Sequence, residues 1–332
     1  MTLTRTPAGG RSMRPPAGRS RRPGRRLTFD RVSFFVVFLG LPVALFLVFV
    51  IWPFVQAFYY SLTDWSGFSS SMNFVGVRNY VTLLQDETFM KALRNNVLLA
   101  VVVPAVTLTL AFALATMLTV GGRSTGAVRG LRRSNGYRIV SFFPYAIPAI
   151  VSGLIWGQVY DPSGGLLNGL LGVIGIDNDN FAWLGDSSSA IWAVMFVIIW
   201  TMVGFYTLLF VAAIKGIPAE LFDAARIDGA GRMRTAFSVT LPMIRENVQT
   251  AYIYIGILAL DAFVYMAALE PDGGPQNSTL VMAQDLFSTA FEKGHFGLAS
   301  AMGVTLAAVT LAFAALVFVV NWLTGGRRGK KA

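Results

Sequence analysis

Six long apolar segments alternate with polar connections along this chain. They lie near Val32–Pro53, Val97–Val120, Ile139–Tyr160, Ala190–Ile214, Val248–Leu269 and Ala299–Leu323. As helices rising 1.5 Å per residue, all are long enough to cross a hydrocarbon core of about 30 Å. The first segment is expected to be retained as a span, because no small-residue cleavage site follows it. The pattern predicts an all-α polytopic membrane protein with six transmembrane helices.

Basic residues gather on alternate connections. Most of the 27 Lys and Arg residues lie in the N-terminal arm, the second-to-third and fourth-to-fifth connections, and the C-terminal tail. The opposite connections hold only Arg78, Lys91, Arg94 and Lys293. Because basic loops stay in the cytoplasm, we expect a multi-pass protein of the cell membrane with both termini cytoplasmic.

The same distribution divides the chain into three parts. A basic arm, rich in Pro and Gly and expected to be disordered, covers 1–31, and a basic tail covers 326–332. Between them lies a six-helix membrane domain, 32–325, with a cytoplasmic loop at 215–247. The net charge of +10 is placed where membrane lipids are met, so we expect lipid contact and no nucleic-acid partner.

Composition excludes several kinds of chemistry. The chain is 55% hydrophobic and 13% charged, it has no cysteine, and His295 is its single histidine. Disulfides, thiolate metal sites and multi-histidine metal clusters are therefore excluded. The glycine-rich tail at 325–331 lacks the spacing of a phosphate-binding loop. We expect no enzyme activity and no cofactor in this chain, so energy for transport would come from elsewhere.

The connection between the fourth and fifth segments has the pattern helix, glycine, helix. Pro218 suits the first turn of a helix, and Glu220 complements the dipole at that end. Gly229 can adopt positive φ and end the helix, and a second short helix is expected from about Gly231 to Val239.

One face of the first loop helix is small and apolar. Leu221, Ala224 and Ala225 recur at helical spacing, which suits a groove on a partner protein. The pattern alone is equally compatible with an interfacial helix pair that only joins two spans.

This loop resembles the EAA loop of inner-membrane permease subunits of ATP-binding-cassette importers. The family pattern is E-A-A, three residues, G, nine residues, I, one residue, L-P. Asp223-Ala224-Ala225, Gly229, Val239 and Leu241-Pro242 fall at those spacings, with Asp in place of Glu and Val in place of Ile. The resemblance implies that the loop couples the chain to ATPase subunits. The residues assigned to this role are Glu220, Leu221, Asp223, Ala224, Ala225, Asp228, Gly229, Ala230, Val239, Leu241 and Pro242.

Other motifs are similar to those of carbohydrate-uptake permeases of the maltose and glycerol-phosphate type. They include 73–80, Phe143-Pro-Tyr-Ala-Ile-Pro148, and Gly273-Gly-Pro275 followed by 297–301. The resemblance covers roughly 33–325 and implies the fold of a type I importer permease from a bacterium. It also implies a second permease, two ATPase subunits that hold ATP and Mg²⁺, and an external solute-binding lipoprotein. The expected solute is a sugar, either an oligosaccharide or an amino sugar.

Asp261 is the one charged residue within the apolar segments. A charge at the centre of a span costs about 2.5–3.5 kcal/mol, so Asp261 is a candidate for function. The expected solute path comprises Asp261, Tyr265, Tyr206, Asn168, Gly273, Gly274 and Pro275. Three alternatives stay open: Asp261 lies near the outer interface or pairs across a permease dimer, it titrates in a proton-coupled secondary transporter, or the chain is a membrane scaffold.

Overall fold

The structure is a computed structural model that describes residues 33–34, 36–69, 71–119, 136, 140–176 and 181–325. The described residues are helical except for loops and one isolated bridge between Thr63 and Phe74. The chain divides into two compact units, residues 1–54 and 55–332.

The first unit contains one apolar helical run. It comprises η1 (Val36–Gly40), α2 (Leu41–Phe46) and η2 (Leu47–Ile51), and it continues into α3 (Trp52–Tyr60). The whole run, Val36–Tyr60, is long and apolar enough to span a membrane. None of its side chains in η1, α2 or η2 is buried within the chain. A helix that is apolar on all sides must be surrounded by lipid or protein, which agrees with the predicted first transmembrane span.

The second unit holds three more long apolar helices and two bent pairs. The long helices are α5 (Glu87–Thr119), α9 (Ala190–Lys215) and α16 (Phe296–Gly325). One bent pair is Val140–Ala146 with α7 (Ala149–Val159), at 110°, and the other is α13 (Arg245–Leu260) with α14 (Phe263–Leu269), at 47°. The described chain therefore has four helices that are long and apolar enough to span a membrane, or up to six such spans if each bent pair counts as one.

Two of the six expected spans are broken in the structure. The third breaks at Ile147–Pro148, after the short helix η3 (Phe143–Ala146), because proline removes a backbone donor and disfavours helix in the residue before it. The fifth breaks at Asp261 and Ala262, whose ψ values of 46° and 17° are not helical. The second span begins at Glu87, before the predicted Val97, because its polar first turns remain helical. The predicted start of the third span at Ile139 lies outside the described residues.

Within the second unit, α5 packs along α9 and α13, α13 also packs against α16, and α14 packs against α7. Fully buried side chains such as Leu99, Val103, Val194 and Phe210 form the core. Glycine permits one close approach here, since a Cβ at Gly204 of α9 would overlap the carbonyl oxygen of Ser141.

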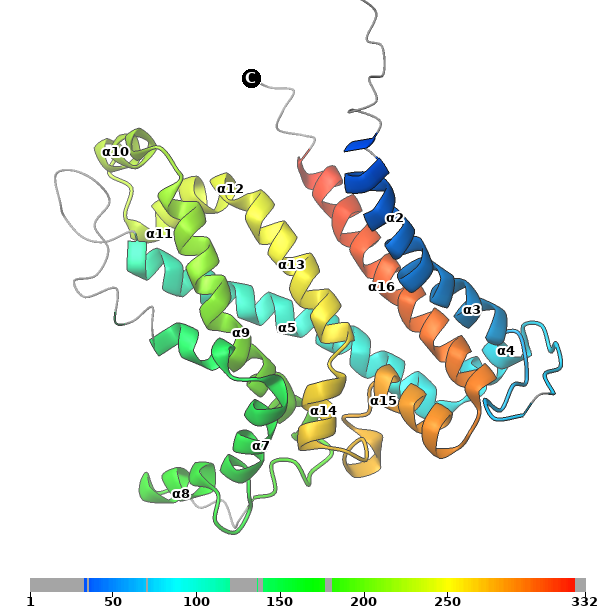
Figure 1. The fold of residues 1–332 in the computed structure, drawn as a ribbon. Helices are drawn as coiled ribbons and strands as arrows, with labels where there is room; N and C mark the ends of the chain where they lie inside the picture. The colour runs from blue at the N-terminus through cyan, green and yellow to red at the C-terminus, as the bar shows by residue number, and fades with distance from the viewer. Residues whose placement is uncertain are drawn as a thin grey trace, which may run out of the picture. The chain divides into compact units, whose positions relative to one another are not determined.

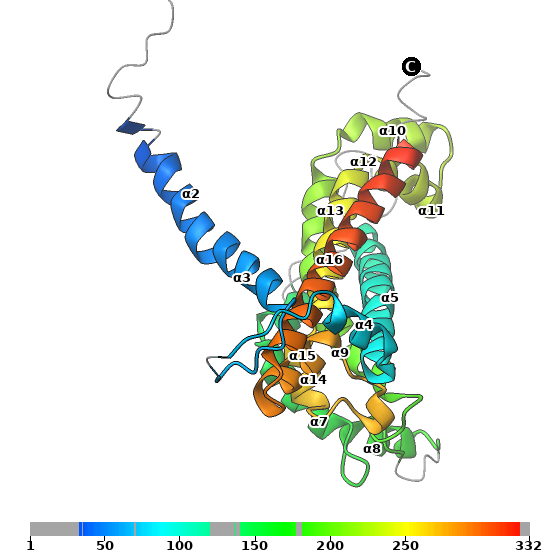
Figure 2. The same cartoon turned by 90° about the vertical axis from the view of Figure 1, so that its right-hand side faces the viewer.

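Shorter helices lie at the two ends of this unit (Figures 1 and 2). One end, named here the α10 end, carries α10 (Ala219–Ile227), α11 (Arg232–Thr235), η4 (Ala236–Thr240) and α12 (Leu241–Met243). The opposite end, named the α8 end, carries α8 (Leu166–Val173), α14 and α7. The remaining short helices are α4 (Arg78–Gln85), η5 (Pro275–Asn277), α15 (Met282–Phe287) and η6 (Ser288–Glu292).

Candidate functional site

The loop at the α10 end folds as helix, glycine turn and helix, as its pattern predicted. Pro218 directly precedes α10, and Glu220 lies in its first turn. Gly229 has φ of +72°, and its N–H donates to the carbonyl of Arg226 at 3.0 Å, while the N–H of Ala230 donates to Ala225 at 2.9 Å. These bonds satisfy carbonyls at the end of the helix in a left-handed turn that favours glycine.

The outward face of α10 differs from the predicted one. Ala225 is only 9% exposed and Phe222 only 3% exposed, so these two side chains pack inward. Leu221 is 40% exposed, Ile227 is 87% exposed, and Ala224 is also exposed. The prediction that Ala225 shares an outward face with Leu221 and Ala224 was wrong, because the bulky Phe222 side chain sets which side of the helix is buried.

The second helix of the loop is longer than expected. It runs without a gap from Arg232 to Met243 through α11, η4 and α12. Met233 and Phe237 are exposed, whereas Thr235 and Thr240 are buried. Of the other residues assigned to coupling, Glu220, Asp223, Asp228 and Pro242 are exposed, and Ala230, Val239 and Leu241 are half-buried. The loop therefore presents both apolar and acidic side chains at the α10 end.

A cavity of about 560 Å³ lies between α9 and α13. Its lining consists of Tyr145, Phe205, Tyr206, Leu209, Glu246, Asn247, Thr250, Ala251, Tyr254 and Leu258. Four aromatic rings stand beside one carboxylate, one amide and a hydroxyl from Thr250. Binding sites for small molecules are usually of this size, mostly apolar, and carry a few polar groups that fix orientation.

Tyr206 is the one predicted solute-path residue that lines this cavity. Asp261 lies at the break between α13 and α14, where it is exposed and its N–H donates to the carbonyl of Ile257. Tyr265 is 8% exposed within α14, outside the lining. The structure therefore does not bring the predicted path residues together at one cavity.

Asn168 supports the loop at the α8 end. Its amide nitrogen donates to the carbonyls of Pro162 and Phe181, at 3.3 and 3.0 Å, and its oxygen accepts from the indole of Trp183 at 2.7 Å. These bonds tie α8 to the segment before α9, so the geometry gives Asn168 a supporting position rather than a place on the cavity wall.

The loop that contains Gly273, Gly274 and Pro275 is hydrogen-bonded to α5. Both glycines have positive φ, of 79° and 70°. Lys91 donates to the carbonyl of Gln276, and Asn95 donates to those of Ser278 and Leu280, at 3.1 and 2.9 Å. The loop is therefore held by side chains of α5 rather than by regular secondary structure.

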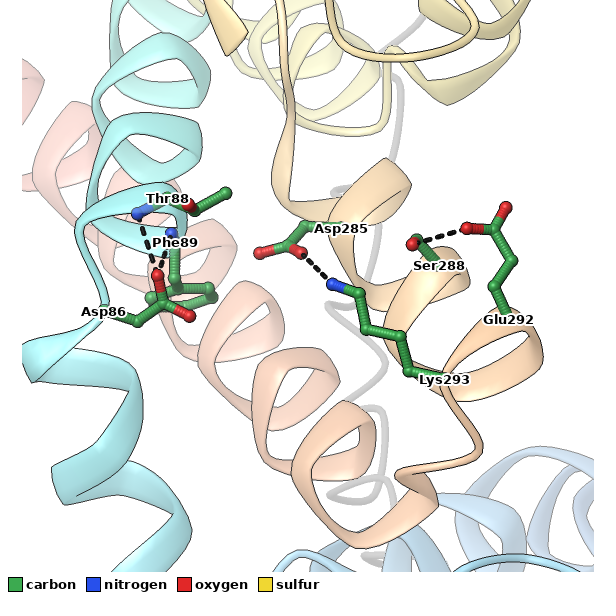
Figure 3. A network of polar contacts seen from close by, with 7 residues as sticks. All are labelled: Asp86, Thr88, Phe89, Asp285, Ser288, Glu292 and Lys293. Atoms are coloured by element: carbon green, nitrogen blue, oxygen red, sulfur yellow. Dashed lines mark hydrogen bonds and ion pairs between the residues drawn. The ribbon is translucent and has the colours of Figure 1, made fainter. Parts of the chain in front are cut away.

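Acidic residues flank this loop in the sequence: Glu270 and Asp272 before it and Asp285 after it. Burial, reinforced by the charge of Asp272, raises the pKa of Glu270 to about 7. Burial also raises the pKa of Asp285, whose carboxylate lies 4.0 Å from the ammonium of Lys293 (Figure 3). In the described part of the chain, no three acidic or histidine side chains form a group that could hold a metal ion.

Residues 118–325 match the family model described as "Binding-protein-dependent transport system inner membrane component". The chain belongs to this family. It is therefore the permease component of a binding-protein-dependent importer, a multi-pass membrane protein without catalytic machinery of its own.

Curated relatives of this permease cover most of its length. It is 62% identical over 322 residues to the diacetylchitobiose uptake system permease NgcF of Streptomyces coelicolor, which spans 96% of this chain and 91% of that protein. It is 31% identical over 271 residues to the multiple sugar-binding transport system permease MsmF of Streptococcus mutans, spanning 81% and 88% of the two chains.

The permease fold is that of a solved importer. A chain of the bacterial alginate transporter, crystallised in complex with its periplasmic protein bound to an alginate pentasaccharide, superposes with a TM-score of 0.73. The two chains are 21% identical, and the match covers 88% of this permease and 96% of that chain. The predicted permease fold is confirmed.

Sequence reasoning missed most of the cavity of the permease. Asn247, Thr250 and Tyr254 recur at i, i+3 and i+7, which places them on one face of a helix, and this spacing could have revealed them. Tyr145 and Phe205 could not have been paired from sequence, because their contact depends on the break in the third span.

Proposed function

We propose that this permease imports diacetylchitobiose or a closely related N-acetylated oligosaccharide, driven by ATP hydrolysis in separate subunits. The observation that carries the proposal is its 62% identity, over 96% of the chain, to a diacetylchitobiose permease. Other relatives, such as MsmF, are sugar transporters by name, which supports the broader sugar class.

The cavity between α9 and α13 is the proposed solute path. Pyranose rings have apolar faces that stack on aromatic side chains, and their hydroxyl and acetamido groups need hydrogen-bonding partners. Tyr145, Phe205 and Tyr254 would offer ring faces, while Asn247 and Glu246 would offer polar contacts. A polar group left unpaired in such a site costs about 1–3 kcal/mol, so polar contacts of this kind select for sugars.

The α10 loop is the proposed attachment point for an ATPase subunit. Ile227 and Leu221 are exposed at the α10 end, and apolar side chains of an exposed helix suit a groove on a partner. In this arrangement the α10 end and both termini are cytoplasmic, in accord with the basic residues of the same connections. The α8 end then faces outward, toward a solute-binding protein.

The complete assembly would contain a second permease, two ATPase subunits and an external binding protein. The alginate transporter supports the external binding protein in this assembly, because it was crystallised together with its solute-bound periplasmic protein. The basic arm at 1–31, the membrane domain at 32–325 and the tail at 326–332 are the proposed division of the chain.

Uptake by intact cells tests the proposal. A strain without this chain should lose high-affinity uptake of labelled diacetylchitobiose, and the wild-type chain should restore it. Excess unlabelled diacetylchitobiose should compete with the label, whereas excess maltose should not. Unchanged uptake in the deletion strain, with the chain's absence verified, would overturn the proposed solute.

A further inference from the structure

One buried amide joins three elements of the second unit. Asn96 of α5 is fully buried, and its amide nitrogen donates to the carbonyl of Leu260 at 2.7 Å. Its amide oxygen accepts from the backbone N–H of Met282, also at 2.7 Å. Leu260 is the last residue of α13, and Met282 is the first residue of α15.

Both backbone partners are groups that a helix end leaves unpaired. The carbonyl of Leu260 lies where the fifth span breaks, and the N–H of Met282 lies in the first turn of α15. An unpaired backbone group in a dry interior is unfavourable by several kcal/mol, so a broken span needs a neighbour to satisfy it. Asn96 satisfies one group on each side.

The break connects the two ends of the bundle. Before it in the chain, α13 carries the cavity residues Asn247, Thr250 and Tyr254, and after it, α14 packs against α7. Asn95 and Lys91 of the same helix hold the loop that runs from α14 to α15. One short stretch of α5 thus forms hydrogen bonds to the loop and to the break at the end of the cavity-lining helix.

We propose that Asn96 is a positioning residue for transport, which fixes the break of the fifth span relative to the loop between α14 and α15. Movement of that loop is then carried through the bonds to Met282 and Leu260 into α13, and so into the cavity wall. This inference rests on the proposed transport function, because its readout is imported solute.

The first test replaces the amide by an apolar group of similar size. Asn96→Leu keeps the packing volume and removes both hydrogen bonds, and the complex is reconstituted with its partner subunits in vesicles. We expect solute imported per ATP hydrolysed to fall at least about threefold, because two buried backbone groups lose their partner. The matched control is Thr119→Val, a buried site on the same helix whose hydroxyl bonds the carbonyl of Ala115.

The second test removes the donor of the bond from Met282 to Asn96. Met282→Pro removes the N–H. Proline is tolerated here because it is favoured at the first position of a helix. The preceding residue, Val281, is extended, with φ of −115° and ψ of 156°, and so accepts a following proline. Met282→Ala is its control, since it shortens the side chain and keeps the N–H. We expect the import ratio, meaning solute imported per ATP hydrolysed, to be lower in the proline variant than in the alanine variant. Adding Asn96→Leu to the proline variant should cause no further loss.

The outcomes separate two failures. An import ratio in Asn96→Leu equal to that of the wild type, or equal ratios in Met282→Pro and Met282→Ala, would overturn the positioning role. A proportionate fall in ATP hydrolysis and uptake, with the ratio kept, would also overturn it, because that is the signature of a residue needed only for assembly. A wild-type complex that imports no diacetylchitobiose would instead contradict the proposed function.

Discussion

The rings of Tyr145 and Phe205 stack with their centroids 4.5 Å apart and their planes inclined by 19°. Tyr145 belongs to η3, ahead of the break in the third span, and Phe205 belongs to α9. Both line the cavity between α9 and α13, so the break of one span supplies an aromatic wall to the site formed with another.

Truncating this pair should weaken solute affinity. In Phe205→Ala we expect the KM for uptake to rise about 2- to 12-fold, because an aromatic contact contributes about 0.5–1.5 kcal/mol beyond its buried area. Phe318→Ala on α16, where Phe318 is 59% exposed, is the matched control and should keep the wild-type KM. A KM for Phe205→Ala equal to the control would remove the aromatic wall from the solute path.

An aspartate introduced on α10 should impair docking at one position and folding at another. Ile227 is 87% exposed, so Ile227→Asp should leave membrane yield unchanged and reduce the ATPase that co-purifies with the permease. Ala225 is 9% exposed, so Ala225→Asp should lower the yield of the folded permease itself, since it buries an unpaired charge. Wild-type ATPase recovery with Ile227→Asp would show that this face is not the docking surface.

Two glycines of α7 should differ in their tolerance of a methyl group. A Cβ at Gly153 would overlap the Cβ of Ala268 on α14, whereas a Cβ at Gly157 meets no atom within 4 Å. We expect Gly153→Ala to lower the Tm of the purified complex. Gly157→Ala should hold it constant or raise it, because alanine is favoured over glycine in a helix by about 1 kcal/mol. Equal Tm values for the two variants would contradict the close packing of α7 on α14.

Glu270 should make stability depend on pH. Its pKa is raised from 4.5 to about 7 by burial and by the charge of Asp272, so the folded protein binds a proton that an unfolded chain releases. The stabilising contribution is therefore complete below about pH 4.5 and is lost as the pH rises through 7.

Thermal unfolding at pH 5.5 and pH 8.5 measures this effect. We expect the wild type to lose more stability across this interval than Glu270→Gln, which has no proton to release. In Asp272→Asn the loss should be smaller and should be complete at lower pH, because one of the two causes of the raised pKa is removed. A Glu270→Gln variant with the same pH dependence as the wild type would contradict the assignment.

The sequence was sufficient for the long unbroken spans and for the helix–glycine–helix form of the loop at the α10 end, for physical reasons that differ. Long apolar runs such as Ala190–Ile214 have one stable solution in a bilayer, and Gly229 occupies a turn that other residues adopt at a cost. Both signals are local, so a single chain carries them completely.

What sequence reasoning did not supply depends on contacts between distant segments. The buried side of α10 was misassigned at Ala225, because it is determined by where Phe222 finds a core. The break in the fifth span has no proline, and Asn96, which donates to the carbonyl of Leu260 there, lies 164 residues before Leu260 in the chain. The cavity likewise joins η3, α9 and α13, which no single motif connects.

The most direct test of the whole account is uptake into vesicles that contain the reconstituted complex. Labelled diacetylchitobiose and the solute-binding protein are supplied outside, and ATP is either enclosed or omitted. We expect the labelled sugar to accumulate only when ATP is enclosed. Accumulation should persist when a proton conductor dissipates the pH gradient, and the Asp261→Asn variant should retain part of it. Accumulation driven by a proton gradient without ATP, and abolished by Asp261→Asn, would contradict this account and would indicate a proton-coupled carrier.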